Sequence, residues 1–387
     1  MRSRAATVAA LTLAACQASE NRADFVEADS AGVRIVESRA PLWVEGEGWS
    51  LAEAPTLEIG AVEGAANEVL YRVTDVDRRP DGGWLVTSAA TSQLLLFSDE
   101  GVFEGAIGRA GEGPGEFNGL TRAWITAEGG IAAYSFRQLT FFDAQGTFVE
   151  QFALSGGAPT DFFDDGTFLS VSQSMFREEG GAFRPPASLL RRGRDGAVLD
   201  TLVRVPGASV FVLVSDNSSS TFGTPFGANR LVAALGNSVV TMGGDSFEAR
   251  VFDETGALVR VMRRSWEPVR VTDAQIAALQ SRMMEGLPDR LRPSRERLFR
   301  EWSYPEFVAA VDRLMVDADH NVWARAYQTD LPGRVLWSVF DPTGRWLGEV
   351  EVPAGLVVHE IGSDYLAGVW TNELDVQFVR VYELQKE

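Results

Sequence analysis

The chain has 387 residues, of which 54 are acidic and 35 are Lys or Arg, so its formal net charge is -19. This acidic surplus argues against a nucleic-acid partner, because contact with a phosphate backbone requires clustered basic side chains. A single Cys excludes a disulfide framework and a Cys-based zinc site, and two His residues leave little for His-dependent catalysis.

The first 16 residues have the pattern of a bacterial lipoprotein signal. Two Arg residues near the start precede an uncharged stretch, residues 5–15, which is too short to cross a bilayer that requires about 20 apolar residues. The stretch ends in Leu-Ala-Ala followed by Cys16, which resembles the lipobox in which Cys is lipidated. We therefore predict a signal peptide over residues 1–15 and a lipid anchor on Cys16. The alternatives are an ordinary cleaved signal with an incidental Cys, or a buried free thiol.

The region after the anchor sets the expected location. Residues 16–32 are expected to be the lipidated Cys and a flexible tether, because they are polar and rich in Ala. Gln17 stands where Asp usually signals retention in the inner membrane of similar lipoproteins. We expect a protein of the bacterial cell envelope, anchored to a membrane and with the outer membrane favoured, whose body lies in the periplasm or at the cell surface.

A five-residue turn motif recurs between apolar runs. Its copies begin with Phe, continue with polar residues and end with Gly, at residues 97–101, 142–146, 252–256 and 340–344, with a weaker copy at 192–196. A polar residue opens a tight turn, and Gly closes it because the closing position takes a positive φ. Each copy therefore predicts a β-hairpin.

A second hairpin motif alternates with the first. Its six copies join two apolar runs through polar or Gly-containing turns near residues 81–83, 128–130, 165–166, 236–237, 319–321 and 363–364. Four strands recurring at roughly 40–50 residues are typical of propeller blades. The spacing is uneven, and its longest step, between residues 236 and 320, contains an insertion.

These repeats predict an all-β fold, a six-bladed β-propeller over residues 33–387. Residues 57–69 repeat the pattern of residues 106–117, so residues 55–60 are expected to be the outermost strand of the last blade. The other three strands of that blade come from residues 357–385. Pairing of the chain start with the C-terminal blade closes the ring and removes an open sheet edge.

Residues 272–310 interrupt the β pattern. Thr272 and Gln275 form a capping-box signature, and apolar residues follow at helical spacing, so we predict a short helical insertion. Six Arg residues lie between 282 and 300. This basic patch is either a docking surface for an acidic partner or a solvated helix face that pairs with acidic neighbours.

Residues 107–117, with the sequence Ile-Gly-Arg-Ala-Gly-Glu-Gly-Pro-Gly-Glu-Phe, resemble the linker of NHL-type repeats and of the bacterial lipoproteins called six-bladed β-propeller proteins. The hairpins before this linker, and residues 318–323, are similar to the same repeat. The resemblance covers about residues 55–385. It implies the fold and no particular chemistry.

In a propeller, the loops between blades and the loops between second and third strands open on one face around the channel. The candidate ligand-binding residues are the polar side chains of these two loop sets: Arg109, Glu112, Glu116, Glu63 and Glu68 from the first, and Arg137, Asp245, Gln328, Asp330, Asn372 and Glu373 from the second. Converging carboxylates could hold Ca²⁺, which takes six to eight oxygen ligands. This arrangement resembles the metal-dependent lactonases and esterases of the same architecture. No metal or other cofactor is our first expectation.

No constellation of catalytic residues stands out. His320 is expected in a hairpin turn, and His359 is followed by Glu360, which should point to the opposite face of a strand. Neither lies in an identifiable arrangement with a Ser or Cys nucleophile. We predict a binding or interaction module for an unknown protein or small-molecule ligand. The alternative is a Ca²⁺-dependent lactonase or esterase.

Overall fold

The computed structural model describes residues 25–44, 46–65, 67–173, 179–215, 218–328 and 333–386. The predicted signal peptide and the predicted lipid site at Cys16 lie outside the described residues. The lipid anchor therefore stays a prediction.

The predicted turn motifs form tight hairpin turns. Asp143 Oδ1 accepts hydrogen bonds from the backbone N–H groups of Gln145 (3.0 Å) and Thr147 (2.8 Å). Gly146 closes the turn with a φ of 78°. The turn that begins at Asp253 has the same contacts.

Within the described residues, six four-stranded units follow one another along the chain, so the molecule is a six-bladed β-propeller, as predicted. The strands of blades 1 to 3 are β5 (Val73–Arg78), β6 (Trp84–Ser88), β7 (Gln93–Phe97) and β8 (Phe103–Ile107), then β9 (Leu120–Ile125), β10 (Ile131–Ser135), β11 (Gln138–Phe142) and β12 (Phe148–Ala153), then β13 (Pro159–Phe162), β14 (Phe168–Gln173), β16 (Pro186–Arg192) and β17 (Val198–Pro206).

Blades 4 and 5 have the same order, and blade 6 takes part of its sheet from the chain start. Their strands are β20 (Leu231–Leu235), β21 (Ser238–Met242), β22 (Glu248–Phe252) and β23 (Leu258–Arg264), then β24 (Val311–Val316), β25 (Val322–Ala326), β26 (Arg334–Phe340) and β27 (Trp346–Pro353), then β28 (Leu356–Ile361), β29 (Tyr365–Thr371) and β30 (Gln377–Lys386). β4 (Leu57–Ile59) and β3 (Trp49–Leu51) both pair with β30. The expected pairing of residues 55–60 with the C-terminal sheet is therefore observed for residues 57–59.

A hydrophobic cluster lies between each blade and the next, and also between blade 6 and blade 1. Buried side chains of adjacent blades that belong to the same cluster are Leu94 and Ile131, Phe141 and Phe168, Leu189 and Val239, Val240 and Phe340, Trp337 and Leu366, and Val379 and Trp84. Since burial of apolar surface contributes roughly 25 cal/mol per Å², these clusters are the main source of stability. They hold the first strands of the blades in place around the channel.

The N-terminal segment runs along the outer edges of three blades. β2 (Val33–Ser38) pairs in parallel with β23 of blade 4. The backbone N–H groups of Leu42 and Trp43 then donate to β27 of blade 5, at 3.1 and 2.8 Å, before β3 and β4 reach blade 6. The segment thus covers sheet edges that would otherwise expose unpaired backbone groups.

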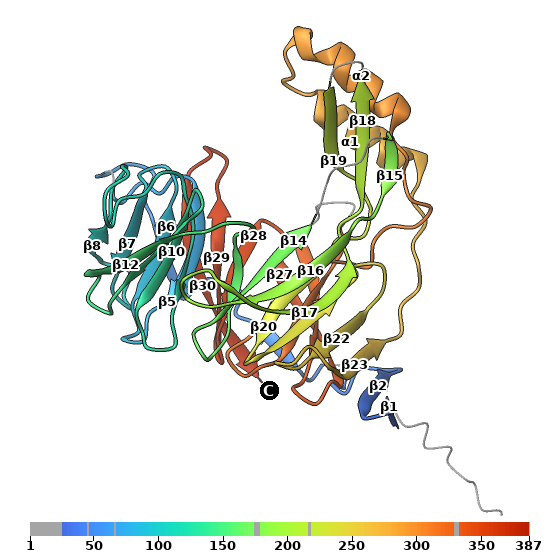
Figure 1. The fold of residues 1–387 in the computed structure, drawn as a ribbon, viewed down its shortest axis with the longest axis horizontal. Coiled ribbons are helices and arrows are strands. Elements are labelled where there is room, and N and C mark those ends of the chain that lie inside the picture. Colours follow the sequence, from blue (N-terminus) through green and yellow to red (C-terminus); the bar gives the residue numbers. More distant parts are fainter. Residues whose placement is uncertain are drawn as a thin grey trace, which may run out of the picture.

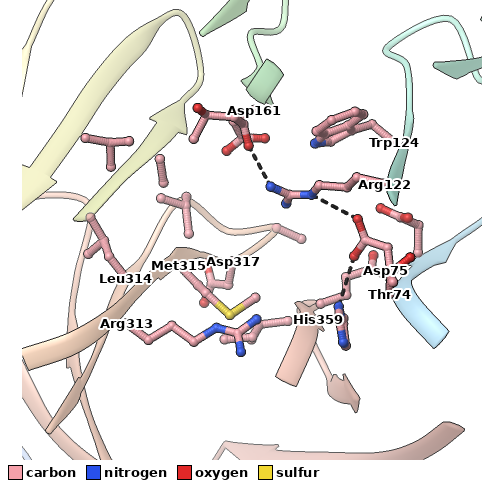
Figure 2. Close-up of a pocket in the computed structure, with 18 residues that line it drawn as sticks. Thr74, Asp75, Arg122, Trp124, Asp161, Arg313, Leu314, Met315, Asp317 and His359 are labelled. Carbon is pink, nitrogen blue, oxygen red and sulfur yellow. Dashed lines mark hydrogen bonds and ion pairs between the residues drawn. The ribbon is translucent and has the colours of Figure 1, made fainter. Parts of the chain in front are cut away.

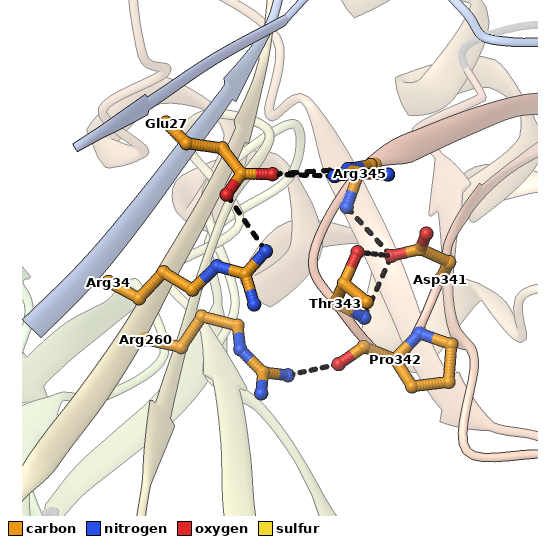
Figure 3. A network of polar contacts seen from close by, with 7 residues as sticks. All are labelled: Glu27, Arg34, Arg260, Asp341, Pro342, Thr343 and Arg345. Atoms are coloured by element: carbon orange, nitrogen blue, oxygen red, sulfur yellow. Dashed lines mark hydrogen bonds and ion pairs between the residues drawn. The ribbon is translucent and has the colours of Figure 1, made fainter. Parts of the chain in front are cut away.

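β1 (Phe25–Ser30) folds back on β2 and contacts blade 5 through a polar network (Figure 3). Glu27 accepts hydrogen bonds from Arg345 Nη2 (3.0 Å) and Arg34 Nη2 (2.9 Å). Residues 25–30 fall in the range expected to be a tether and form a strand instead. The reason is a tertiary contact that local sequence patterns do not show: Glu27 pairs with Arg345 of blade 5, which is distant in the sequence.

Three insertions between propeller strands come together at one end of the molecule, opposite to β1 and β2 (Figure 1). We call this unit the crest; it consists of β15 (Gly181–Phe183), β18 (Val210–Ser215), β19 (Ser218–Gly223), α1 (Asp273–Met284), η1 (Asp289–Leu291) and α2 (Arg292–Glu301). Phe211, Leu298 and Trp302 are its buried core. The crest adds a small core of its own to the propeller.

The helical insertion and its capping box are confirmed. The Thr272 side chain accepts from the Gln275 backbone N–H, and the Gln275 side chain accepts from the Thr272 backbone N–H. In α2, Arg297 pairs with Glu301 at 2.7 Å, as in a solvated helix face. Among the described residues, no helix has the length and apolar character needed to span a membrane.

Candidate functional site

The first strands of the six blades line a cavity of about 570 Å³ (Figure 2). β5, β9, β13, β20, β24 and β28 each contribute side chains to its wall. The volume lies within the range of small-molecule sites in proteins. The cavity is therefore the candidate functional site.

A β-bulge precedes a charged residue on five of these first strands, as far as the described residues show. The pairing register skips one residue just before Asp75, Arg122, Asp161, Arg313 and Glu360. A bulge puts two residues of one strand opposite a single partner and redirects the following side chain. On β28, His359 and Glu360 consequently both line the cavity, and the expectation of opposite faces was wrong because the strand is not regular there.

Asp75 is the centre of a polar network in the cavity wall. Its side chain is 5% exposed, and Arg122 Nε donates to its Oδ2 at 2.9 Å. His359 Nδ1 lies 3.0 Å from its Oδ1. His359 itself lines the cavity, and the contact with Asp75 orients its imidazole ring. Asp75 thus connects blades 1, 2 and 6.

The network continues from Arg122 into blades 3 and 4. Arg122 Nη1 donates to the backbone oxygen of Thr160 at 2.7 Å. Asp161 accepts from the backbone N–H groups of Ala234 (2.9 Å) and Phe162 (3.0 Å). Burial raises the pKa of Asp161 and outweighs the opposing effect of Arg122.

Two acidic groups next to Asp75 bind protons more tightly than free carboxylates. Burial, with the charges of Asp75 and Glu360, raises the pKa of Asp77 well above its usual value. Burial also raises the pKa of Glu360 to about 7. Tyr365 donates a hydrogen bond to Glu360 at 2.8 Å, and Glu360 accepts another from the backbone N–H of Arg78. The site therefore contains groups that can exchange protons near neutral pH.

Arg313 of blade 5 lines the cavity as well. Burial, with the charges of Arg325 and Arg122, lowers its pKa to about 10, so it remains cationic at neutral pH. The cavity thus combines guanidinium groups, an oriented imidazole and carboxyl groups of different protonation states. Such a wall can bind a polar ligand and move a proton, whereas no Ser or Cys nucleophile occurs among the described lining residues.

The sequence-predicted binding residues lie elsewhere. None of the eleven lines this cavity in the part of the chain that the structure describes, and Asp330 lies outside that part. Asp245 pairs with Arg184 (3.1 Å) beside a separate cavity near the crest. Arg137 Nε contacts the Leu154 backbone oxygen (3.4 Å). Whether these side chains bind a ligand of their own stays a prediction.

Other predicted residues stabilise their own loops. Glu68 accepts from the backbone N–H of Ala65 at 3.0 Å, and Asn372 accepts from Leu374 and Val376 in its turn. Gln328 Nε2 donates to the backbone oxygen of Arg334 (3.4 Å), and Glu112 accepts from Asn118 (3.4 Å). For Glu63 and Glu373, the structure shows no side-chain hydrogen bond with another residue that it describes.

The linker of residues 108–117 shows the same behaviour. Glu116 accepts from Arg109 Nε (2.7 Å) and from the backbone N–H of Gly113 (2.9 Å). Phe117 is fully buried between blades 1 and 2. The Gly-rich sequence permits this tight loop: Gly108 has a φ of 79°, and a Cβ there would approach Phe117 to 2.3 Å. The contacts of these linker residues thus stabilise the loop itself and its packing between the blades.

No cluster of three or more His, Cys, Asp or Glu side chains suited to a metal ion occurs among the residues that the structure describes. The carboxylates of Asp75 and Asp161 already accept hydrogen bonds from protein donors. The described residues therefore offer no set of ligands for the predicted Ca²⁺ ion.

Charged residues within the first strands are a sequence signal for the cavity wall. In the first strand of five of the six second-type hairpins, a charged residue interrupts the apolar run, as at Asp75, Arg122 and Arg313. Charges at this position in several blades predict a polar channel wall, since the first strands line the channel. The bulges that aim the side chains could not be seen in the sequence.

Comparison with known proteins supports the fold. Residues 70–163 match a family model described as a 6-bladed β-propeller. A solved structure from Bacteroides fragilis, named as an exported protein, is 13% identical with a TM-score of 0.50, over 91% of this chain and 98% of that one. No curated protein matches the chain.

Two further solved structures have lower TM-scores. A protein from Bacteroides vulgatus is 9% identical, with a TM-score of 0.49 over 88% of this chain and 99% of that one. Virginiamycin B lyase from Staphylococcus aureus is 9% identical, with a TM-score of 0.40 over 87% and 99% of the two chains. At such identities these similarities assign no activity to this chain.

Proposed function

We propose that this protein is a lipid-anchored binding module of the bacterial cell envelope that holds a small molecule in its channel. The observation that carries the proposal is the charged cavity of about 570 Å³ formed by the first strands of all six blades. Charged side chains are costly to bury unless they are paired within the protein or bind a ligand. A cavity of this size suits a small molecule better than a peptide.

The envelope location rests on the sequence of residues 1–16, with the outer membrane favoured by Gln17. The exported protein of similar fold is consistent with this location. Because the rest of the chain is strongly acidic, anionic headgroups would repel it, and an acyl chain must supply the membrane affinity.

The anchor is tested with the variant Cys16→Ser in bacteria that are fed a labelled fatty acid. We expect the parent chain to carry the label and to sediment with membranes, whereas the variant loses the label and is released. A variant that remains in the membrane fraction without label would contradict the lipid anchor.

Ligand binding is tested by native mass spectrometry of the full chain, purified in detergent from its own envelope. We expect a bound small molecule that is lost in Val232→Phe, because Val232 lines the cavity and the larger ring occupies it. Val102→Phe is the control, since Val102 is 60% exposed. If neither the parent nor the control retains a ligand, and no small molecule raises their melting temperature, the binding proposal is wrong.

A Ca²⁺-dependent lactonase or esterase is the second candidate. The observation in its favour is that His359, oriented by Asp75, lies beside Glu360, whose pKa is near 7. This function predicts that Ca²⁺ raises the melting temperature and that chelation abolishes turnover of lactones or aryl esters. Unchanged melting on chelation, together with no turnover, would exclude it.

A further inference from the structure

Arg313 is an uncompensated cation in the cavity wall. Its guanidinium has no hydrogen bond or ion pair with any described residue, while Asp312 beside it pairs with Arg325 at 2.6 Å. Asp75, the other carboxylate near it, is occupied by Arg122 and His359. A partly buried charge without a partner is unfavourable in a folded protein. No described residue therefore supplies an anion that pairs with Arg313.

A second unsatisfied group lies on the same cavity. The buried Oδ2 atom of Asp77 has no hydrogen-bond partner among the described residues. Asp77 lines the cavity on β5, whereas Arg313 lines it on β24 (Figure 2 shows Arg313). Native structures rarely leave buried polar atoms unpaired without a ligand, water or functional role. Arg313 and Asp77 are thus two polar groups on one cavity that the described residues leave without a partner.

The charges of the wall restrict the chemistry of an occupant. A planar guanidinium matches a carboxylate with two parallel hydrogen bonds. Asp75, Asp161 and Glu360 on the wall disfavour a doubly charged phosphate and favour a ligand with hydrogen-bond donors on its other side. The ligand thus needs one anionic end and one donor-bearing end.

We propose that the cavity binds a small organic carboxylate that also carries hydroxyl or ammonium groups, with Arg313 pairing with its carboxylate. This inference rests on the proposed function as a small-molecule binding module and specifies its ligand class. Hydroxy acids, sugar acids and amino acids belong to this class.

The test is a binding screen on the full chain in detergent, by thermal shift and ligand-detected NMR. The probes are hydroxy acids, sugar acids and amino acids, each with its primary amide, together with neutral sugars and inorganic phosphate. We expect binding of at least one acid and no binding of its amide. Arg313→Gln should weaken the dissociation constant of that acid about ten- to hundredfold, since hydrogen bonds to charged groups contribute about 1.5–3 kcal/mol.

Two further variants separate charge from folding. Arg313→Lys keeps the charge without the planar fork and should retain part of the affinity. Arg300→Gln, on α2 of the crest, removes an exposed Arg and should leave binding unchanged. Removal of an unpaired cation should not lower stability, so the melting temperature of Arg313→Gln is expected at or above that of the parent.

The possible results lead to different conclusions. If only neutral or cationic probes or phosphate bind, or if Arg313→Gln leaves the affinity of an acid unchanged, the carboxylate assignment is wrong and small-molecule binding still holds. If no probe binds and native mass spectrometry detects no ligand, both proposals are wrong.

Discussion

The linker of residues 108–117 and the cavity wall are both rich in charge, yet they use it differently. In the linker, Arg109 pairs with Glu116 seven residues later, and the loop satisfies its own polar groups. In the wall, Asp75 meets Arg122 and His359, which come from other blades. Charged residues that are close in sequence stabilise their own loop, whereas charged residues brought together by blade packing form a candidate binding site.

Of the variants that test this comparison, the one at the apolar anchor of the linker should have the largest effect on stability. Phe117→Ala empties a fully buried position between blades 1 and 2 and should lower the free energy of unfolding by about 3–5 kcal/mol. Chemical denaturation measures this loss. Phe148→Ala is the control, because Phe148 is 38% exposed and should cost much less. Equal losses for both variants would mean that the linker does not anchor the blades.

The next effect concerns the centre of the wall. Asp75→Ala removes the buried partner of Arg122 and His359 and should cost about 3 kcal/mol, because it leaves polar groups unpaired. Denaturation again gives the stability, and the ligand screen gives the affinity, which should fall as well. A variant as stable as the parent would show that the wall network is not stabilising.

The buried Glu360 makes the free energy of unfolding depend on pH. Its pKa in the folded protein is about 7, above the usual 4.5, so the folded state binds the proton more tightly than the unfolded state. The contribution to stability is full below pH 4.5 and is lost as the pH rises through 7, by up to about 3 kcal/mol. Glu360→Gln should flatten this decline, and Glu100→Gln, at an exposed position, should not. Unfolding free energies measured between pH 4.5 and 8 decide the matter, and the same slope in all three proteins would contradict it.

The smallest effect is expected at the linker surface. Arg109 is 79% exposed, so Arg109→Gln should leave the melting temperature and the ligand affinity close to those of the parent. A clear loss of affinity would move the binding site from the channel wall to the loop face that the sequence predicted.

The repeats in the sequence predict most of the architecture. The hairpin turns, the six blades, the strand at residues 57–59 and the capping box at Thr272 all depend on local patterns of apolar, polar and Gly residues. The crest sheet has no such local pattern: β19 (Ser218–Gly223) is rich in Ser and forms because Phe211 and Trp302 give it an apolar surface to pack on.

The sequence by itself determined how many propeller blades form and where their turns lie, since each hairpin is encoded within a few residues. Only the tertiary structure decided which charges meet. Asp75, Asp77, Arg122, Arg313 and Glu360 are separated by up to hundreds of residues, and single-residue bulges aim most of them at the channel. A bulge depends on the partner strand as well as on its own residues, so local patterns could not reveal it.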